Sequence, residues 1–177
     1  MKFRHALIAV AVLALAACGG GPVKRVSEPA AGIQQLTVRA DGRWDVVIRL
    51  DNFSSVPMRF ANARLDIAFD NGAAATVQAQ PGISIGPESA DVFTATLTPL
   101  PAGRARLANA LADGQGLNYT LGGTVDAGPE DGKSRSYKIE RKSALSPVPG
   151  LPGVLRCGHR RGMPERGFTA RPYAVVC

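Results

Sequence analysis

The residues with the clearest chemical pattern lie near the N-terminus, in the segment Leu15-Ala-Ala-Cys18-Gly19. Small residues before Cys18 would let the chain enter a narrow protease cleft in extended form, with Leu15, Ala16 and Ala17 as the recognition sequence for signal peptidase. The thiol of Cys18 is a nucleophile that can take a diacylglyceryl group as a thioether. The spacing therefore predicts lipid attachment at Cys18. The alternative is an ordinary secretory signal whose cleavage site happens to precede a cysteine.

The residues before this segment have the composition of a signal peptide. Lys2 and Arg4 precede twelve apolar residues, Ala6–Ala17. As a helix this stretch would span about 18 Å, too little for a hydrocarbon core of about 30 Å, and it has the length of a signal-peptide core. Residues 1–17 thus resemble the signal peptide of a bacterial lipoprotein. In that class Gly19, in place of Asp, implies transfer to the outer membrane, with the protein on its periplasmic face.

The rest of the chain leaves little room for nucleophilic or metal chemistry. Between Gly19 and Arg156 the sequence contains neither His nor Cys, which excludes a Ser-His-Asp or Cys-His site and a His/Cys zinc site there. Asp126, Glu130 and Asp131 share a loop and carry the oxygen ligands that Ca²⁺ prefers, but their spacing does not match an EF-hand. We therefore expect no catalytic residue, no metal and no cofactor.

The charge is concentrated at the ends of the chain. Residues 18–155 hold 14 basic and 13 acidic side chains, whereas residues 156–177 hold five arginines and one glutamate. A nearly neutral body has no footprint for nucleic acid. We expect residues 146–177 to be a proline-rich segment followed by a basic, disordered tail. A disulfide between Cys157 and Cys177 and an electrostatic arm for anionic lipid are the alternatives for this tail.

Between these ends, apolar and polar residues alternate over short runs separated by turn signals. A tether at residues 18–32 precedes the expected domain at 33–145. Asp41-Gly42 and Asn71-Gly72 predict hairpin turns, and a change of phase in the third run predicts a bulge near Asn62. The pattern indicates an antiparallel seven-stranded β-sandwich of the immunoglobulin or fibronectin type III kind, with one short helix at Ala102–Asp113. The strands are expected at Leu36–Val38, Trp44–Leu50, Met58–Phe69, Ala73–Ala79, Val92–Leu97, Leu117–Val125 and Tyr137–Ile139.

Asn52 continues the inward face of the strand that begins at Trp44. A buried amide left without partners costs roughly 1–3 kcal/mol, so we expect its side chain to cap backbone groups in the Asp51–Pro57 turn. Contact with a ligand is the alternative.

The domain resembles the water stress and hypersensitive response domain of the late embryogenesis abundant group 2 family. The residues that carry the resemblance are Val46–Asn52, Pro57, Leu65–Phe69, Leu107–Leu111 and Leu117–Gly122. Of the family's asparagine-proline-asparagine motif this chain keeps Asn52, and it has Phe53 and Ser54 in the other two places. The resemblance implies a fibronectin type III-like sandwich in stress and desiccation proteins, without a catalytic site.

Two classes of function follow from these observations. The first is a non-enzymatic lipoprotein of the bacterial cell envelope, attached to the membrane by lipid on Cys18, that protects the envelope under water stress. The second is an accessory lipoprotein that binds a protein or glycan partner in an envelope assembly. A ligand-sized apolar patch on the domain, or a strand edge left free for pairing, would favour the second.

Overall fold

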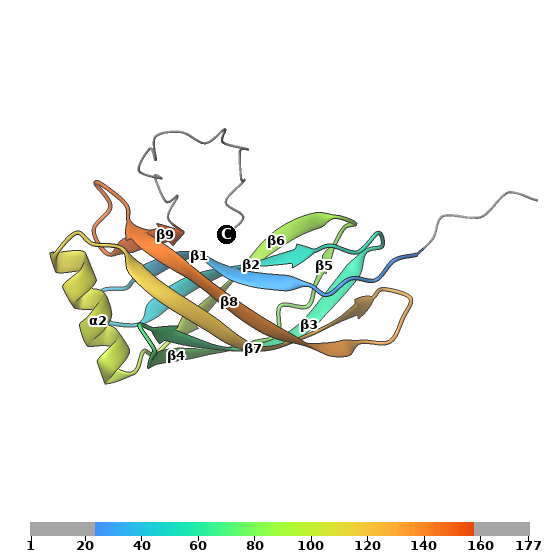
Figure 1. Ribbon diagram of the computed structural model, residues 1–177, viewed down its shortest axis with the longest axis horizontal. Helices are drawn as coiled ribbons and strands as arrows, with labels where there is room; N and C mark the ends of the chain where they lie inside the picture. The colour runs from blue at the N-terminus through green and yellow to red at the C-terminus, as the bar shows by residue number, and fades with distance from the viewer. Residues whose placement is uncertain (1–23, 158–177) are drawn as a thin grey trace, which may run out of the picture.

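The computed structural model describes residues 24–157, which form nine β-strands and one helix (Figure 1). The elements are β1 (Ala30–Val38), β2 (Trp44–Asn52), β3 (Met58–Phe69), β4 (Gly72–Ala79), β5 (Ile83–Ile85), β6 (Ser89–Leu97), α2 (Pro101–Ala112), β7 (Leu117–Pro129), β8 (Arg135–Pro147) and β9 (Val154–Cys157).

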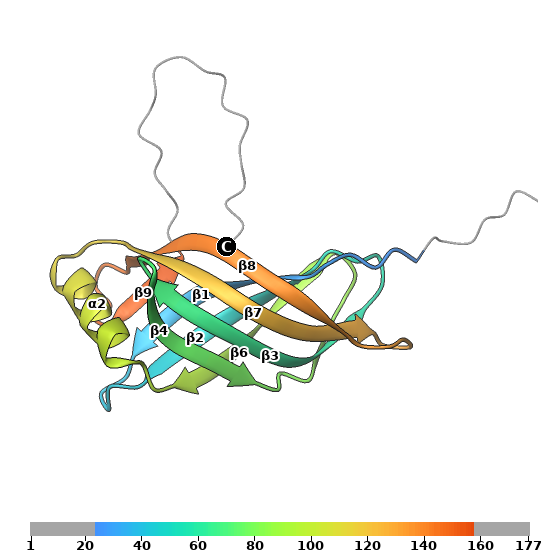
Figure 2. The same ribbon diagram turned by 60° about the horizontal axis from the view of Figure 1, so that its bottom comes forward.

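All strand pairs are antiparallel, and they follow one path in the order β4-β3-β7-β8-β9-β1-β2-β6, with β5 paired to β3. The sheet is strongly twisted and folds over on itself, so that β1, β2 and β6 lie across from β3, β4 and β7 (Figure 2). The result is a nearly closed, barrel-like sheet whose two end strands are β4 and β6. Helix α2 lies at one end of the barrel, beside β4 (Figure 1).

The all-β class and the short helix are confirmed, whereas the seven-stranded immunoglobulin or fibronectin type III-like sandwich is not. Two strands were missed because they are only three and four residues long, too short to show alternation. β5 lies between Pro81-Gly82 and Gly86-Pro87, and β9 follows a segment rich in proline and glycine. β9 also changes the architecture, because it joins two sheets that would otherwise be separate.

β9 pairs with β8 on one side and with β1 on the other. Leu155 lies opposite Pro147 of β8 and Leu36 of β1, and its side chain is fully buried. The sheet therefore continues past residue 145, where we expected the domain to end, and residues 154–157 belong to it. Cys157 is disulfide-bonded, and the other two cysteines, Cys18 and Cys177, lie outside the described residues.

The turns and bulges follow backbone preferences at particular residues. The β3–β4 turn uses Asp70 and Asn71, with φ of 44° and 70°, so it lies one residue earlier than the Asn71-Gly72 pair predicts. In the β1–β2 loop only Gly42 has a positive φ, 79°. The predicted bulge in β3 is confirmed, since the register with β7 shifts between Phe60 and Asn62.

The core fills the space between the two halves of the barrel. The rings of Trp44 and Phe69, one from each half, lie 5.7 Å apart. A second contact is polar: the Ile33 backbone N–H, at a bulge in β1, donates to the hydroxyl of Tyr119 on β7 at 3.1 Å, and both residues are buried. This hydrogen bond gives the buried backbone N–H of Ile33 a partner.

If β9 is an integral strand, shortening its buried side chain will destabilise the whole domain. Leu155→Ala removes a fully buried side chain and should lower the free energy of unfolding by about 2–5 kcal/mol. Arg156→Ala changes the next, exposed side chain and should cost no more than about 0.5 kcal/mol. Urea denaturation followed by tryptophan fluorescence measures both values. Equal stability of the Leu155→Ala variant and the parent would show that β9 adds nothing to the fold.

Candidate functional site

Asn52 lies at the end of β2, and its side chain is almost completely buried, at 1% exposure. Its amide nitrogen donates to the carbonyl oxygens of Val56 at 2.9 Å, Ile85 at 3.0 Å and Gly86 at 2.8 Å. Its amide oxygen accepts the backbone N–H of Ser54 at 2.8 Å. One side chain thus connects the Asn52–Pro57 turn to the segment between β5 and β6.

The same turn holds the first described residues of the chain. The backbone N–H of Ser27 donates to Ser54 Oγ at 3.0 Å, and that of Arg25 donates to Ser55 Oγ at 2.9 Å. In return the backbone N–H of Ser55 donates to the carbonyl of Arg25 at 3.0 Å. The turn that Asn52 caps is therefore the place where the N-terminal segment attaches to the domain.

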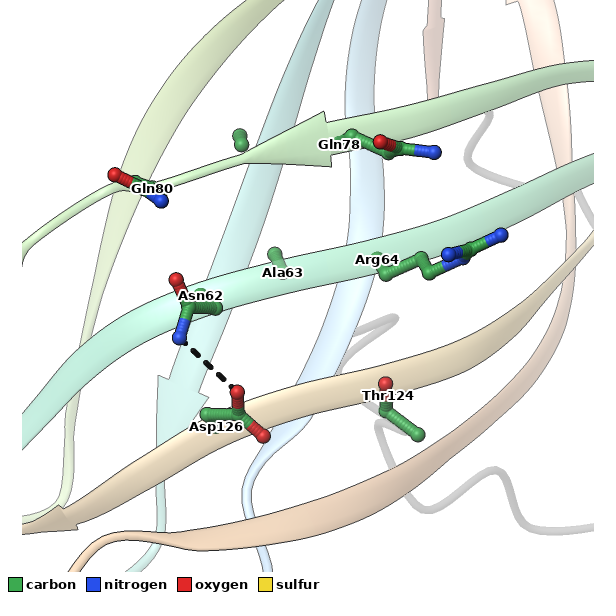
Figure 3. A pocket seen from close by; sticks show the side chains of 8 residues that line it. Asn62, Ala63, Arg64, Gln78, Gln80, Thr124 and Asp126 are labelled. Carbon is green, nitrogen blue, oxygen red and sulfur yellow. Dashed lines mark hydrogen bonds between the residues drawn. The ribbon is translucent and has the colours of Figure 1, made fainter.

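A hollow of about 430 Å³ lies on the outer face of β3, β4 and β7 (Figure 3). It extends from the bulge in β3 to Ala79, the last residue of β4. Its lining is mainly polar, with two alanines among the residues that contribute to it. The lining residues are Asn62, Ala63, Arg64, Gln78, Ala79, Gln80, Thr124 and Asp126.

Strand register brings these polar side chains together. Arg64 of β3 lies opposite Gln78 of β4 on one side and Thr124 of β7 on the other. At the bulge, Asn62 lies opposite Asp126, and its amide nitrogen donates to Asp126 Oδ2 at 3.1 Å (Figure 3). Sequence reasoning identified the bulge but not the hollow, because the lining residues come from three strands.

A glycine fixes the spacing of β3 and β7 beside Arg64. Gly123 lies opposite Leu65 with φ of +145°, and a Cβ there would collide with the carbonyl oxygen of Arg64. Only glycine adopts this backbone conformation readily, so the close approach of the two strands depends on it.

The hollow offers hydrogen-bond donors and acceptors with little net charge. Arg64 contributes the one formal positive charge and Asp126 the one negative charge. Among the described residues, the side chains of Arg64, Gln78 and Gln80 have no hydrogen-bond or ion-pair partner. A neutral ligand with several hydroxyl groups fits this set better than an anion or a cation.

A second hollow, about 330 Å³ and more apolar, lies at the end of the domain from which the N-terminal segment leaves. It is lined by Lys24, Val26, Val56, Pro57, Pro129, Glu130, Asp131 and Gly132. Glu130 accepts a hydrogen bond from Ser84. Within residues 24–157, no three His, Cys, Asp or Glu side chains are grouped to hold a metal ion. Of the three acids weighed for Ca²⁺, Asp126 lies within β7, whereas Glu130 and Asp131 lie in the turn between β7 and β8.

The carboxylates with shifted pKa lie away from both hollows. The Thr96 hydroxyl donates to Asp45 at 2.6 Å and, with Arg39 also beside that carboxylate, holds the pKa of Asp45 below its usual value. The Arg43 side chain donates to Asp41 at 2.8 Å and lowers the pKa of Asp41 in the same way. Both pairs fasten the β1–β2 hairpin and its neighbour β6.

The residues predicted for lipid attachment, Leu15, Ala16, Ala17 and Cys18, lie outside the described residues. Within residues 24–157, no helix has the length and apolar character needed to cross a membrane.

No protein-family model matches the sequence, and no curated protein matches it significantly. Solved structures do resemble the fold at low identity. A protein from Archaeoglobus fulgidus is 15% identical (70% of this chain, 98% of that one, TM-score 0.40). A protein from Arabidopsis thaliana is 10% identical (72% and 83%, TM-score 0.45). A protein described as late embryogenesis abundant is 11% identical (86% and 87%, TM-score 0.40). At these values the similarity supports neither a family assignment nor a function.

Mutation can test whether Asn52 holds the Asn52–Pro57 turn in place. Asn52→Ala leaves three carbonyl groups and one N–H without their partner, and unsatisfied buried groups cost about 1–3 kcal/mol each. We expect the free energy of unfolding to fall by at least about 2 kcal/mol. Asn62→Ala, at a surface asparagine with one side-chain hydrogen bond, should cost no more than about 0.5 kcal/mol. Similar losses for both variants in thermal unfolding would contradict the assigned role of Asn52.

Proposed function

We propose that this chain is a lipoprotein of the bacterial cell envelope, anchored through Cys18, whose β domain protects the envelope under water stress without turning over a substrate. The anchor is expected in the outer membrane, with the domain on the periplasmic side. The observation that carries the proposal is the Leu15–Cys18 sequence together with the fastening of Arg25 and Ser27 to the domain.

The length of chain between anchor and domain supports this arrangement. Lys24, the first described residue, follows Cys18 by six positions. Six residues reach at most about 20 Å when fully extended. Because the next residues are hydrogen-bonded to Ser54 and Ser55, a lipid on Cys18 would keep this end of the domain close to the bilayer.

The surface at this end suits a position beside lipid. Val26 and Phe53 are two of the large apolar side chains that remain exposed, at 46% and 47%. Lys24 and Val26 also line the more apolar hollow, next to Val56 and Pro57. Apolar side chains beside a basic residue favour contact with an anionic membrane surface.

The protective role rests on the resemblance of the domain sequence to the water stress and hypersensitive response domain of late embryogenesis abundant proteins. Asn52 is the residue of this chain that keeps the family's motif, and its amide organises the turn to which the N-terminal segment is fastened. A role without substrate turnover agrees with a domain sequence that has neither His nor Cys between Gly19 and Arg156.

The second candidate, an accessory lipoprotein that binds a glycan, is favoured by the polar hollow on β3, β4 and β7. Its mixed donors and acceptors match the hydroxyl groups of a sugar, and Arg64 and Gln78 have no side-chain partners among the described residues.

A complementation experiment tests both candidates. A deletion strain should lose viability on drying and at high osmolarity, and the wild-type gene should restore it. Cys18→Ala should abolish acylation, move the protein to the aqueous phase in detergent partitioning and fail to restore survival. Cys157→Ala, at a cysteine expected to carry no lipid, should leave the protein in the detergent phase.

A variant of the hollow separates the two candidates. A double variant, Arg64→Ala with Asp126→Ala, removes both charges from the hollow and should restore survival fully if protection does not involve a glycan. If the deletion strain tolerates drying and shows only an assembly defect that this double variant cannot repair, the accessory function is correct. If the Cys18→Ala variant is still acylated and still partitions into the detergent phase, the proposal that Cys18 anchors the protein is refuted.

A further inference from the structure

The first five described residues, Lys24–Glu28, lie against the Asn52–Pro57 turn, at the end of the barrel opposite α2 (Figure 1). We call this segment the strap. Four of its five residues are exposed, and burial begins at Pro29. The strap therefore contributes little apolar surface to the core, and it can leave the domain while the barrel stays folded.

Polar contacts hold the strap to the domain. The backbone N–H groups of Arg25 and Ser27 donate to the hydroxyls of Ser55 and Ser54. The Arg25 guanidinium forms an ion pair with Glu88 at 3.0 Å, and the two side chains are 61% and 67% exposed. Because water competes for exposed hydrogen bonds and ion pairs, the contacts of Arg25 hold the strap only weakly.

The charges at the start of the strap are opposite in sign to those of the domain beside them. Lys24 lines the more apolar hollow together with Glu130 and Asp131 of the β7–β8 turn. The next residue, Arg25, is the one paired with Glu88. The strap is thus basic where the neighbouring surface is acidic.

The end of the strap shows the reverse arrangement. Glu28 lines a hollow of about 310 Å³ together with Lys138, Glu140 and Arg141 of β8. These three side chains carry a net positive charge. The strap and the domain are therefore complementary in charge at both ends of the strap, and attraction between exposed charges depends on ionic strength.

We propose that the strap is a salt-sensitive device: it stays on the domain at low ionic strength and detaches as far as Pro29 when the ionic strength rises. Between about 0.1 M and about 1 M salt the Debye length falls from about 10 Å to about 3 Å, so attraction between exposed charges is largely screened. Loss of water concentrates the ions around a protein of the cell envelope. The strap would then respond to the condition against which the domain is proposed to protect.

The consequence of detachment for the position of the domain rests on the proposed anchor at Cys18. With the strap in place, six residues connect Cys18 to Lys24; with the strap detached, eleven connect Cys18 to Pro29. The root-mean-square length of a flexible tether rises from about 13 Å for six residues to about 18 Å for eleven. Its fully extended length rises from about 20 Å to about 40 Å. Detachment would therefore let the domain reach envelope components further from the bilayer.

Amide hydrogen exchange of the mature Cys18→Ala chain, followed by NMR, tests the strap without a lipid anchor. Between about 0.1 M and about 1 M NaCl, we expect the amides of Arg25 and Ser27 to exchange at least threefold faster. The amide of Ser54, which donates to the Asn52 side chain, should change much less. An equal change at Ser54 would show that the turn itself opens, and would overturn the proposal.

A charge variant tests whether the effect of salt acts through the strap. Glu88→Gln keeps the shape of the side chain and removes the charge that faces Arg25. At low salt it should bring the exchange of the Arg25 and Ser27 amides close to the wild-type rates at high salt. The matched control is Asp70→Asn, which removes a charge from an exposed ion pair with Arg106 at the α2 end of the barrel and should leave the strap unchanged.

The proposal is overturned if Arg25 and Ser27 exchange at the same rates at both salt concentrations, or if Glu88→Gln behaves like Asp70→Asn. Neutron reflectometry of the acylated chain on a supported phosphatidylcholine bilayer tests the change in reach. The distance between the domain and the headgroups should grow by about 5 Å at high salt, and a constant distance would contradict detachment. If no protein layer remains on the bilayer while Arg25 and Ser27 still respond to salt, the anchor is refuted and the salt-sensitive strap is supported.

Discussion

The hydrogen bonds of the Asn52 amide are the constraint on which the arrangement of this domain depends. At the end of β2, three carbonyl groups and one N–H from two loops meet inside the protein. Buried backbone groups of this kind must find partners within the chain, and a single amide supplies both the donor and the acceptor that they need. The amide therefore holds the two loops together. One of these loops leads into β6, and the other carries the attachment of the N-terminal segment.

Two other connections complete the barrel. β9 joins the half that contains β8 to the half that contains β1, and the hydroxyl of Tyr119 binds the backbone of Ile33 across the core. With β9 in place the strands form one path, and β4 and β6 are its two ends. The domain is thus fastened at its N-terminal segment and continuous through its middle.

The parts of this fold that could be predicted from sequence are those determined by near neighbours. The long strands follow from alternation, and the bulge at Asn62 follows from a change of phase within one strand. β9 could not be predicted because its four residues are too few to show alternation, and because one of its two partners, β1, lies about 120 positions earlier, as in Gln35–Arg156. The same reason hides the polar hollow: Arg64, Gln78 and Thr124 are unremarkable until the register places them side by side.

Hydrogen exchange tests most directly whether Asn52 holds the N-terminal segment to the domain. In the full-length mature chain, the amides of Ser27 and Ser54 should be protected, and Asn52→Ala should make both exchange at least tenfold faster. Amides in the β7–β8 ladder, such as that of Leu121, should accelerate much less, because they do not depend on the turn. If Ser27 and Ser54 exchange at the same rate in the variant and the wild type, the account is wrong.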